Sequence, residues 1–276
     1  MTTRGWAIVT GASGGIGAMF TKALAQRGLS VLAVARASSS LTKIAGELRD
    51  GGAHVETLPA DLASAEGVSA VTAKAEALGD IELLVNNAGL STSGRFLEQS
   101  AKKEVESIRV NVEALYALTR AILPGMVARK GGGIINVASI VAFHAIPYWT
   151  TYAATKAFVL SFGEGLACEL RHSGVRVVTV CPGFTKTGLY AESGVPGLAG
   201  KLLPFATPGE VVRVALAAYD AGRVIRIVGV TNRLLALSGA LTPRFILRSL
   251  MAKMFAPTGA QGPSAGPTSP RPSTVR

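Results

Sequence analysis

The sequence predicts an α/β fold in which a doubly wound, parallel, seven-stranded sheet carries helices on both faces. Three observations lead to this prediction. Short apolar runs alternate with segments of helical periodicity over residues 6–228, and such alternation builds right-handed strand–helix–strand units. The apolar runs are nearly continuous, as expected of parallel strands that are buried on both faces. A glycine-rich turn follows the first run, and ligands of such sheets bind where the carboxyl ends of the strands meet.

The expected elements follow one another in chain order. The runs of strand length are residues 6–10, 30–35, 54–59, 81–86, 133–138, 176–181 and 224–228. The segments with helical spacing are the Ile16/Phe20/Leu24 face and residues 63–78, 100–127, 152–171 and 208–221. A bend is expected near Pro124, because proline removes a helical hydrogen bond. The last helix has a clear start, since Thr207 and Glu210 can form a capping box around Pro208.

The composition indicates a large apolar core and an intracellular protein. Of the 276 residues, 49% are hydrophobic and 16% are charged, which is far from a disordered composition. The longest uncharged stretch, residues 131–155, contains three glycines, a histidine and a proline, so it would make a poor membrane-spanning helix. The first apolar run begins at Trp6, which leaves no room for a signal peptide. Cys168 and Cys181 give no disulfide framework, and we expect a cytoplasmic protein with reduced thiols.

The net charge of +11 is concentrated near the C-terminal end. Residues 1–220 hold 20 Lys/Arg and 17 Asp/Glu, whereas residues 221–276 hold eight Lys/Arg and no acidic residue. A mildly charged body without zinc-ligand spacing or alternating aromatic and basic residues argues against nucleic-acid binding. We expect a catalytic domain (1–233), a basic amphipathic extension (234–256) and a disordered tail (257–276), because the tail is rich in Pro, Gly, Ser and Thr.

The glycine-rich turn between the first strand and the first helix indicates a nucleotide site. It reads Thr10-Gly11-Ala12-Ser13-Gly14-Gly15-Ile16-Gly17. Glycines let the backbone turn sharply and approach a pyrophosphate, which then meets the free N–H groups and the positive dipole of the helix N-terminus. A purely structural turn is the alternative, but the position between a strand and a helix favours the nucleotide. The predicted contacts in this turn are Gly11, Ser13, Gly15, Ile16 and Gly17.

The end of the second strand indicates which nucleotide binds. NAD sites place an acidic residue there to hold the ribose 2′-hydroxyl, and NADP sites place an arginine nearby for the 2′-phosphate. Here the strand ends at Arg36, and the first acidic residue of the chain is Glu47. Because an arginine can bind a phosphate through two parallel hydrogen bonds, we predict NADP(H) as the cofactor. A solvated surface arginine is the simpler alternative.

Catalytic chemistry is expected from Ser139, Tyr152 and Lys156. The tyrosine and the lysine are four residues apart at the start of a helix, so they lie on the same face. A phenol with a pKa of about 10 is a poor acid at neutral pH, but a neighbouring ammonium group stabilises the phenolate and lowers that pKa. Ser139 follows the fifth strand, where its hydroxyl can hydrogen-bond a substrate oxygen. The Tyr-x-x-x-Lys spacing is common on helices and is weak evidence by itself. Its position after the glycine turn and Ser139 in the chain makes a catalytic function a better explanation.

With these residues in place, the chain resembles the short-chain dehydrogenase/reductase family over about residues 5–230. The motifs that carry the resemblance are Thr10–Gly17, Asp61-Leu62, Asn86-Asn87-Ala88-Gly89, Asn111, Ser139, Tyr152 with Lys156, and Pro182-Gly183 with Thr185 and Thr187. The resemblance implies the compact single-domain branch, a Rossmann-like fold, and hydride transfer between NADP(H) and a carbonyl/alcohol pair without a metal. We also expect a homo-oligomer.

The resemblance further implies a role for each site residue. Tyr152 is expected to donate or accept the proton, and Ser139 to orient the substrate oxygen. Lys156 is expected to bind the nicotinamide ribose and tune the tyrosine, and Asn111 to anchor a water-linked proton relay. The other implied cofactor contacts are Asp61 and Leu62 at the adenine, Asn87 along the cofactor, and Pro182, Gly183, Thr185 and Thr187 over the nicotinamide.

Two other functions are compatible with part of this pattern. A catalytically silent NADPH-binding sensor or scaffold could use the same fold, although such a protein would typically have lost one of Asn111, Ser139, Tyr152 and Lys156. An epimerase or dehydratase of the family's extended branch would need a longer substrate domain than residues 190–256 supply.

The residues around the reaction centre favour a hydrophobic carbonyl or alcohol substrate, although its identity is not determined. His144 lies in the same region, and we assign it no role because it has no metal or acidic partner. Apolar side chains that could either form the substrate pocket or simply pack in the core are Phe143, Ile146, Tyr148, Trp149, Phe184, Leu189 and Tyr190.

The 234–256 extension has two interpretations. Arg244 and Arg248 are one helical turn apart among apolar residues, and the segment contains no acidic residue. A basic amphipathic helix of this kind suits the surface of an anionic membrane, and it is too short to span one. The simpler alternative is that the helix packs on the fold or on a second subunit.

Overall fold

The computed structural model describes residues 4–36, 39–187 and 204–256, and within them it contains the predicted parallel sheet. Seven strands pair in parallel in the order β3-β2-β1-β4-β5-β6-β7. Each strand matches an expected run to within two residues at either end. The strands are β1 (Arg4–Thr10), β2 (Leu29–Ala35), β3 (Val55–Pro59), β4 (Ile81–Asn86), β5 (Gly133–Val137), β6 (Arg176–Cys181) and β7 (Ile225–Ile227).

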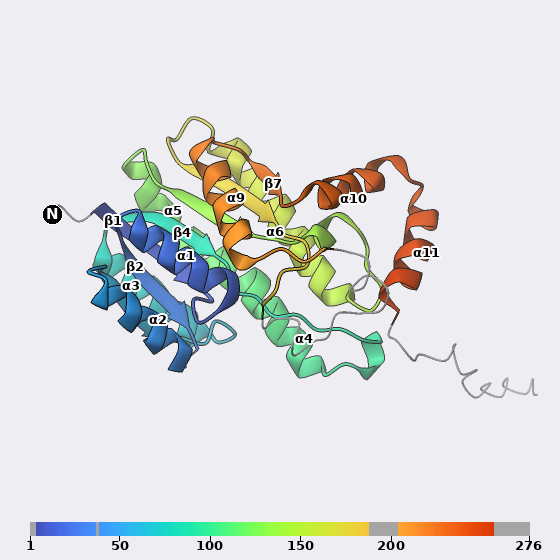
Figure 1. The fold of residues 1–276 in the computed structure, drawn as a ribbon, viewed down its shortest axis with the longest axis horizontal. Coiled ribbons are helices and arrows are strands. Elements are labelled where there is room, and N and C mark those ends of the chain that lie inside the picture. Colours follow the sequence, from blue (N-terminus) through green and yellow to red (C-terminus); the bar gives the residue numbers. More distant parts are fainter. Residues whose placement is uncertain (1–3, 37–38, 188–203, 257–276) are drawn as a thin grey trace, which may run out of the picture.

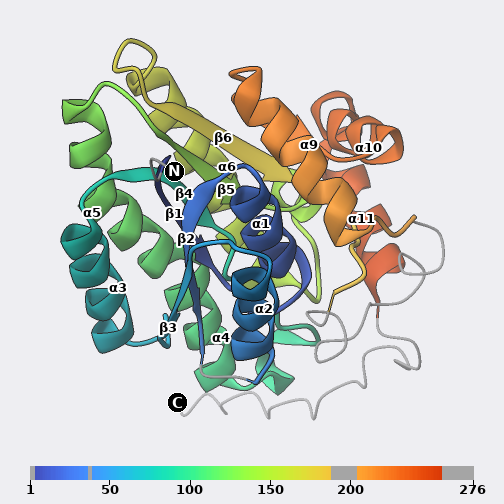
Figure 2. The same ribbon diagram turned by 60° about the vertical axis from the view of Figure 1, so that its left-hand side comes forward.

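Helices cover both faces of this sheet, as Figures 1 and 2 show. One layer consists of α1 (Gly15–Gln26), α2 (Ser39–Asp50) and α9 (Pro208–Asp220). The opposite layer consists of α3 (Ala65–Leu78), α4 (Ala101–Ile108), α5 (Leu115–Ala128) and α6 (Thr150–Glu169). Phe20 and Leu24 of α1 are buried under the first layer, and Leu118 and Ile122 of α5 are buried under the second. The doubly wound architecture is therefore confirmed.

Two features depart from the expected elements. The helix α2 was not among them, since only Leu41 and Ala45 of its twelve residues are buried and the apolar pattern is weak. The long 100–127 segment is irregular at Arg109–Ala114, where the backbone makes a π-helical turn that carries the buried Asn111. Pro124 lies within α5, beyond this turn. Such π-turns inside α-helices often occur at functional sites.

After β7 the chain forms α10 (Val230–Leu241) and α11 (Arg244–Phe255) at one end of the molecule (Figure 1). Met251 and Phe255 of α11 are buried against apolar residues of the segment that leads into α6. The inner side of the extension therefore packs on the fold, as the simpler interpretation expects, and the boundary expected after residue 233 falls inside α10. Across the described ranges, no helix combines the length and apolarity needed to cross a membrane. The expected tail, residues 257–276, lies outside the described residues.

The packing of α6 on β6 gives a test of the fold. A methyl group on Gly163 would collide with the Thr179 hydroxyl, whereas one on Gly165 would meet nothing within 4 Å. We predict that Gly163→Ala lowers the free energy of unfolding by about 1–3 kcal/mol through overpacking. The matched Gly165→Ala variant should raise it by up to about 1 kcal/mol, because alanine favours helix. Urea denaturation of both variants measures these changes, and equal shifts would contradict the observed packing.

Candidate active site

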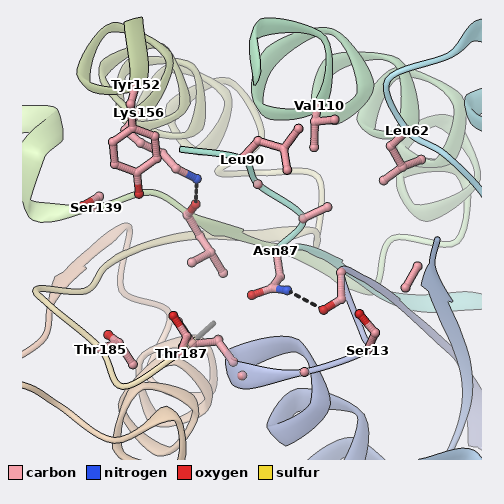
Figure 3. Close-up of a pocket in the computed structure, with 18 of the residues that line it drawn as sticks. Ser13, Leu62, Asn87, Leu90, Val110, Ser139, Tyr152, Lys156, Thr185 and Thr187 are labelled. Atoms are coloured by element: carbon pink, nitrogen blue, oxygen red, sulfur yellow. Dashed lines mark hydrogen bonds between the residues drawn. The ribbon is translucent and has the colours of Figure 1, made fainter. Parts of the chain in front are cut away.

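The candidate site lies where the strand order of the sheet reverses, between β1 and β4. Connections leave these two strands in opposite directions, and the divergence leaves a crevice at their carboxyl ends. A cavity of about 770 Å³ opens there. Figure 3 shows Ser139, Tyr152 and Lys156 at one end of this cavity, and Ser13 and Leu62 at the other.

The glycine turn is held tightly against the end of β4. Gly11 has a φ of 66°, and a methyl group at this position would lie 2.8 Å from Nδ2 of Asn87. That same Nδ2 donates a hydrogen bond to the carbonyl oxygen of Thr10, at 2.8 Å. Gly17 is buried, and a methyl group there would collide with the carbonyl oxygen of Gly11. The missing side chain of Gly17 therefore lets the first turn of α1 approach the backbone of Gly11 closely. Gly17 itself is not among the residues that line the cavity.

The N-terminus of α1 faces the cavity with free backbone donors. Within the described residues, no side chain caps this helix at Gly14. Ser13, Gly14, Gly15 and Ile16 all line the cavity. The first N–H groups of a helix have no partner inside it and carry the positive end of its dipole, so this arrangement suits a phosphate or pyrophosphate.

Arg36 marks the other end of the cavity. It follows β2, is exposed to solvent, and contributes to the cavity wall. No ion pair to Arg36 is found in the part of the chain that the structure describes. Asp61 and the buried Leu62 line the wall nearby, and the Asp61 carboxylate accepts a hydrogen bond from the N–H of Ala63 at 3.0 Å. This end of the cavity thus offers a guanidinium group and an apolar surface.

At the opposite end, β5 and α6 bring Ser139, Tyr152 and Lys156 to the same wall. The Nζ atom of Lys156 donates a hydrogen bond to the carbonyl oxygen of Val137 at 2.9 Å and lies 5.9 Å from the centre of the Tyr152 ring. Ser139 accepts a hydrogen bond from the N–H of Val141 at 3.3 Å, where a short 3₁₀ turn begins. A hydroxyl, a phenol and an ammonium group therefore share one region of the cavity.

Burial shifts the pKa values of Lys156 and of the nearby Cys181. It lowers the pKa of the Lys156 ammonium group to about 8, while the nearby Cys181 acts to a smaller extent in the opposite direction. It also raises the pKa of the Cys181 thiol to about 12, against smaller opposing effects of Lys156 and of a backbone hydrogen bond from Ser139. Desolvation disfavours the charged form of each group. Cys181 is therefore a neutral, buried thiol, whereas the pKa of Lys156 lies near 8.

Asn111 lies behind the cavity wall. Its Nδ2 donates hydrogen bonds to the carbonyl oxygen of Leu90 and to the hydroxyl of Thr155, both at 2.9 Å, and its Oδ1 accepts one from the N–H of Leu90 at 2.8 Å. A methyl group on Gly89 would lie 3.3 Å from this Oδ1 and 3.4 Å from Nζ of Lys156. Asn111 thus connects the segment after β4 to α6 through hydrogen bonds, close to Lys156. Its role in a proton relay stays a prediction.

Apart from Gly17 and Asn111, every site residue predicted from the sequence lines the cavity. This includes Pro182, Gly183, Thr185 and Thr187, and the Thr187 side chain would touch a methyl group on Gly15. The sequence patterns did not single out several further wall residues, because they belong to ordinary strand and helix periodicity. These include Leu90, Glu106, Val110, Val137 and Ala138.

Several of the expected substrate-pocket residues pack in the core instead. Ile146, Trp149 and Phe184 are buried in one apolar cluster with Met251 and Phe255 of α11. For these three residues the packing alternative is correct, while Leu189 and Tyr190 lie outside the described residues. His144 is buried in the same region, and its Nε2 donates a hydrogen bond to the carbonyl oxygen of Leu235 in α10, at 2.9 Å. Its observed contact is therefore structural.

A chain of aromatic side chains connects α11 to Tyr152. Trp149 is fully buried, and its ring meets that of Tyr152 edge-on, with the centroids 5.6 Å apart. The same ring also contacts Phe255 and Phe184, with centroid distances of 5.6 Å and 6.0 Å. Aromatic rings favour such tilted and edge-on contacts. The position of Tyr152 therefore depends on a helix more than ninety residues further along the chain.

Comparison with known proteins agrees with this geometry. The family model of short chain dehydrogenases matches residues 5–195. An uncharacterized oxidoreductase of Staphylococcus saprophyticus is 35% identical over 229 residues, which cover 82% of this chain and 96% of that protein. A short-chain dehydrogenase from Sphingobium yanoikuyae in complex with NADPH has a TM-score of 0.78 and 33% identity, covering 96% of this chain and 99% of that one. The bulky-bulky ketone specific alcohol dehydrogenase of Comamonas testosteroni has a TM-score of 0.75 and 28% identity, covering 96% and 98%.

The pKa of Lys156 predicts how cofactor binding depends on pH. Because the ammonium group of the free protein loses its proton near pH 8, the affinity for the anionic NADP(H) should fall by up to about tenfold per unit above that pH. NADPH fluorescence titrations between pH 7 and 9.5 measure this fall. In a Lys156→Met variant the affinity should be lower and nearly constant over the same range. An unchanged decline in that variant would assign the ionisation to another group.

The aromatic chain predicts that α11 affects turnover. Phe255→Ala removes the ring that supports Trp149, so kcat/KM should fall by about tenfold or more through misplacement of Tyr152. NADPH affinity should change little, because the glycine turn and Arg36 lie at the other end of the cavity. Phe245→Ala on the same helix, where the ring is 66% exposed, is the matched control and should leave kinetics unchanged. If both variants had equal kinetics, α11 would have no influence on the tyrosine.

Proposed function

We propose that this chain, which belongs to the short-chain dehydrogenase family, is an NADP(H)-dependent enzyme that interconverts a carbonyl group and an alcohol on a hydrophobic substrate. The observation that carries the proposal is that one cavity is lined by Ser139, Tyr152 and Lys156 at one end and by the glycine turn with Arg36 at the other. A phosphate-binding end and a proton-transferring end, joined in one crevice, are the two parts that nicotinamide-dependent carbonyl chemistry requires.

The cavity residues fit the dinucleotide. A methyl group on Gly14 would meet nothing within 4 Å, so the turn is open to the cavity at this point, and the α1 N-terminus would hold the pyrophosphate there. Leu62 would border the adenine, and Arg36 would bind the 2′-phosphate. Lys156 would hydrogen-bond the nicotinamide ribose, since its Nζ atom uses one donor on Val137 and has others to spare. When bound, the cofactor supplies or accepts the hydride.

The protein's own groups would manage the proton. In the reductive direction, the Tyr152 hydroxyl gives its proton to the carbonyl oxygen of the substrate. Ser139 donates a hydrogen bond to the same oxygen, so that negative charge developing there is stabilised from fixed positions. The Lys156 ammonium group stabilises the resulting phenolate. In the oxidative direction the same groups act in reverse.

Support for a hydrophobic substrate comes from the apolar surroundings of Tyr152. Leu90, Val110 and Val137 line the cavity together with Tyr152, and an apolar lining of this kind favours a hydrophobic substrate. The related alcohol dehydrogenase of Comamonas testosteroni is specific for bulky ketones, which is consistent with such a site. A screen of alkyl, aryl and steroid ketones against sugars, followed by NADPH absorbance, would identify the substrate class.

We also infer that the protein forms a homo-oligomer through α5 and α6. Phe158 and Phe162 of α6 stack with ring planes 8° apart, and Tyr116 of α5 meets Phe162 edge-on. Tyr116 is 51% exposed and Phe158 is 38% exposed. An aromatic surface of this kind on two adjacent helices is suited to a second copy of the same surface. Sedimentation equilibrium of the wild type and a Tyr116→Lys/Phe158→Lys variant tests it.

Replacement of the tyrosine tests the proposed reaction. Tyr152→Phe removes only the proton-transferring hydroxyl, so turnover should fall by about 10²–10⁴-fold or more, while NADPH affinity stays within about twofold. Steady-state rates and fluorescence titration measure the two quantities. A variant with wild-type rates would overturn the mechanism. A wild-type protein that binds NADPH but reduces nothing in the ketone screen would instead be the silent sensor.

Replacement of the arginine tests the cofactor preference. Arg36→Ala removes the charge available to the 2′-phosphate, so NADPH affinity should fall by about 10- to 100-fold, as expected for a charged hydrogen bond worth roughly 1.5–3 kcal/mol. NADH affinity should change little, because that cofactor carries no 2′-phosphate. Parallel titrations with both cofactors provide the comparison. A variant that kept the full preference for NADPH over NADH would show that another residue binds the 2′-phosphate.

A further inference from the structure

We propose that the outward faces of α10 and α11 bind the surface of an anionic lipid bilayer. We call this surface the α10–α11 face. It lies at one end of the molecule, beyond β7 (Figure 1). It is independent of the catalytic residues, and the proposal goes beyond the oxidoreductase function. The exposed apolar residues that define it are Val230, Leu234, Leu237, Phe245, Ile246 and Leu250.

The helix α10 is apolar on the side that points to solvent. Val230, Leu234 and Leu237 recur at the spacing of one helical face, and they are 71%, 65% and 61% exposed. The opposite side faces the protein, where Asn232 is buried and Leu235 packs on the cluster around Trp149. A solvent-facing helix surface is normally polar, so a row of three large apolar residues on that side indicates an interaction surface.

The helix α11 repeats this arrangement. Met251 and Phe255 form its buried side. Ile246 and Lys253 project from roughly the opposite side, because their positions, five residues before and two after Met251, are rotated from it by about 140° and about 200° around the helix axis. Phe245 and Leu250 add two further exposed apolar side chains. Both helices are therefore anchored to the fold on one side and present large apolar groups to the outside on the other.

The charge of the same segment selects the kind of partner. Arg244, Arg248 and Lys253 are exposed on α11, and residues 221–276 contain no acidic residue. Lys253 is on the outward side, whereas Arg244 and Arg248 precede the buried Met251 and Phe255 by seven residues and therefore extend from the inner side of the helix. On α10, Arg233 is half-buried, and its Nε donates a hydrogen bond to the carbonyl oxygen of Ile227 at 3.4 Å. An apolar outward side with exposed cations on the same helix matches the interface of an anionic bilayer, where the apolar groups enter the acyl boundary and the cations meet lipid phosphates. Arginine and lysine can reach the headgroups from such a position through their long stems.

The same charges disfavour a second copy of this chain as the occupant. A symmetric dimer through the α10–α11 face would bring the same basic surface from both subunits together. With no acidic residue on either helix to compensate, this contact would place like charges opposite one another, which is costly at an interface. An anionic bilayer removes that conflict and buries the apolar rows as well.

Co-sedimentation with lipid vesicles tests the proposal on the full chain. The wild type should bind vesicles of phosphatidylcholine with 30% phosphatidylserine at low salt, and bind pure phosphatidylcholine only weakly. Arg244→Glu/Arg248→Glu should reduce the partition coefficient by roughly 25-fold or more, since each basic residue contributes about 1 kcal/mol near an anionic surface. Leu234→Gln/Leu237→Gln should also lose binding, and glutamine keeps the helix propensity.

The matched control is Lys102→Glu/Lys103→Glu. It makes the same change in net charge on α4, where both side chains are exposed, and it should leave vesicle binding within about twofold. All variants should keep the wild-type far-UV spectrum and NADPH affinity. The proposal is overturned if the wild type ignores anionic vesicles at low salt, or if the α4 control loses binding as strongly as the arginine variant. It is equally overturned if Leu234→Gln/Leu237→Gln turns a dimer into a monomer while the wild type does not bind vesicles.

Discussion

The contact between the ends of β1 and β4 is the interaction on which the rest of the site depends. The Thr10 hydroxyl donates to the carbonyl oxygen of Val85 at 3.1 Å and accepts hydrogen bonds from the N–H groups of Asn87 and Ala88, each at 3.0 Å. The Nδ2 atom of Asn87 in turn donates a hydrogen bond to the carbonyl oxygen of Thr10. Each bond is worth only about 1 kcal/mol. Together they hold the glycine turn against the next strand, and the crevice opens beside them.

A second constraint is the burial of Lys156 at the end of β5. The hydrogen bond to Val137 fixes the amine beside Tyr152, but desolvation lowers its pKa from 10.5 to about 8. Because the folded protein binds this proton less tightly than the unfolded chain, the buried ammonium lowers stability at neutral pH, and this penalty diminishes as the pH rises from about 8 to 10.5.

The C-terminal helices join this arrangement from outside the sheet. His144 holds α10 through the carbonyl oxygen of Leu235, and Phe255 of α11 supports Trp149. Both contacts reach the segment between Ser139 and Tyr152. The family model ends at residue 195, so this support comes from a part of the chain beyond that match. One side of the two helices therefore packs against the segment that leads into α6, and the other side presents exposed apolar residues.

The sequence by itself determined the strands, the glycine turn, Arg36 and the one-turn spacing of Tyr152 and Lys156. These features depend on near neighbours: the alternation of strands, the periodicity of a helix and the conformation of glycine act over a few residues. Only the tertiary structure decided which faces are buried. It placed Gly17 and Asn111 behind the wall and Trp149 in the core, and it exposed Leu234, because burial is set by segments far apart in the chain. The low pKa of Lys156 has the same origin, since desolvation comes from the packed surroundings and not from the residue itself.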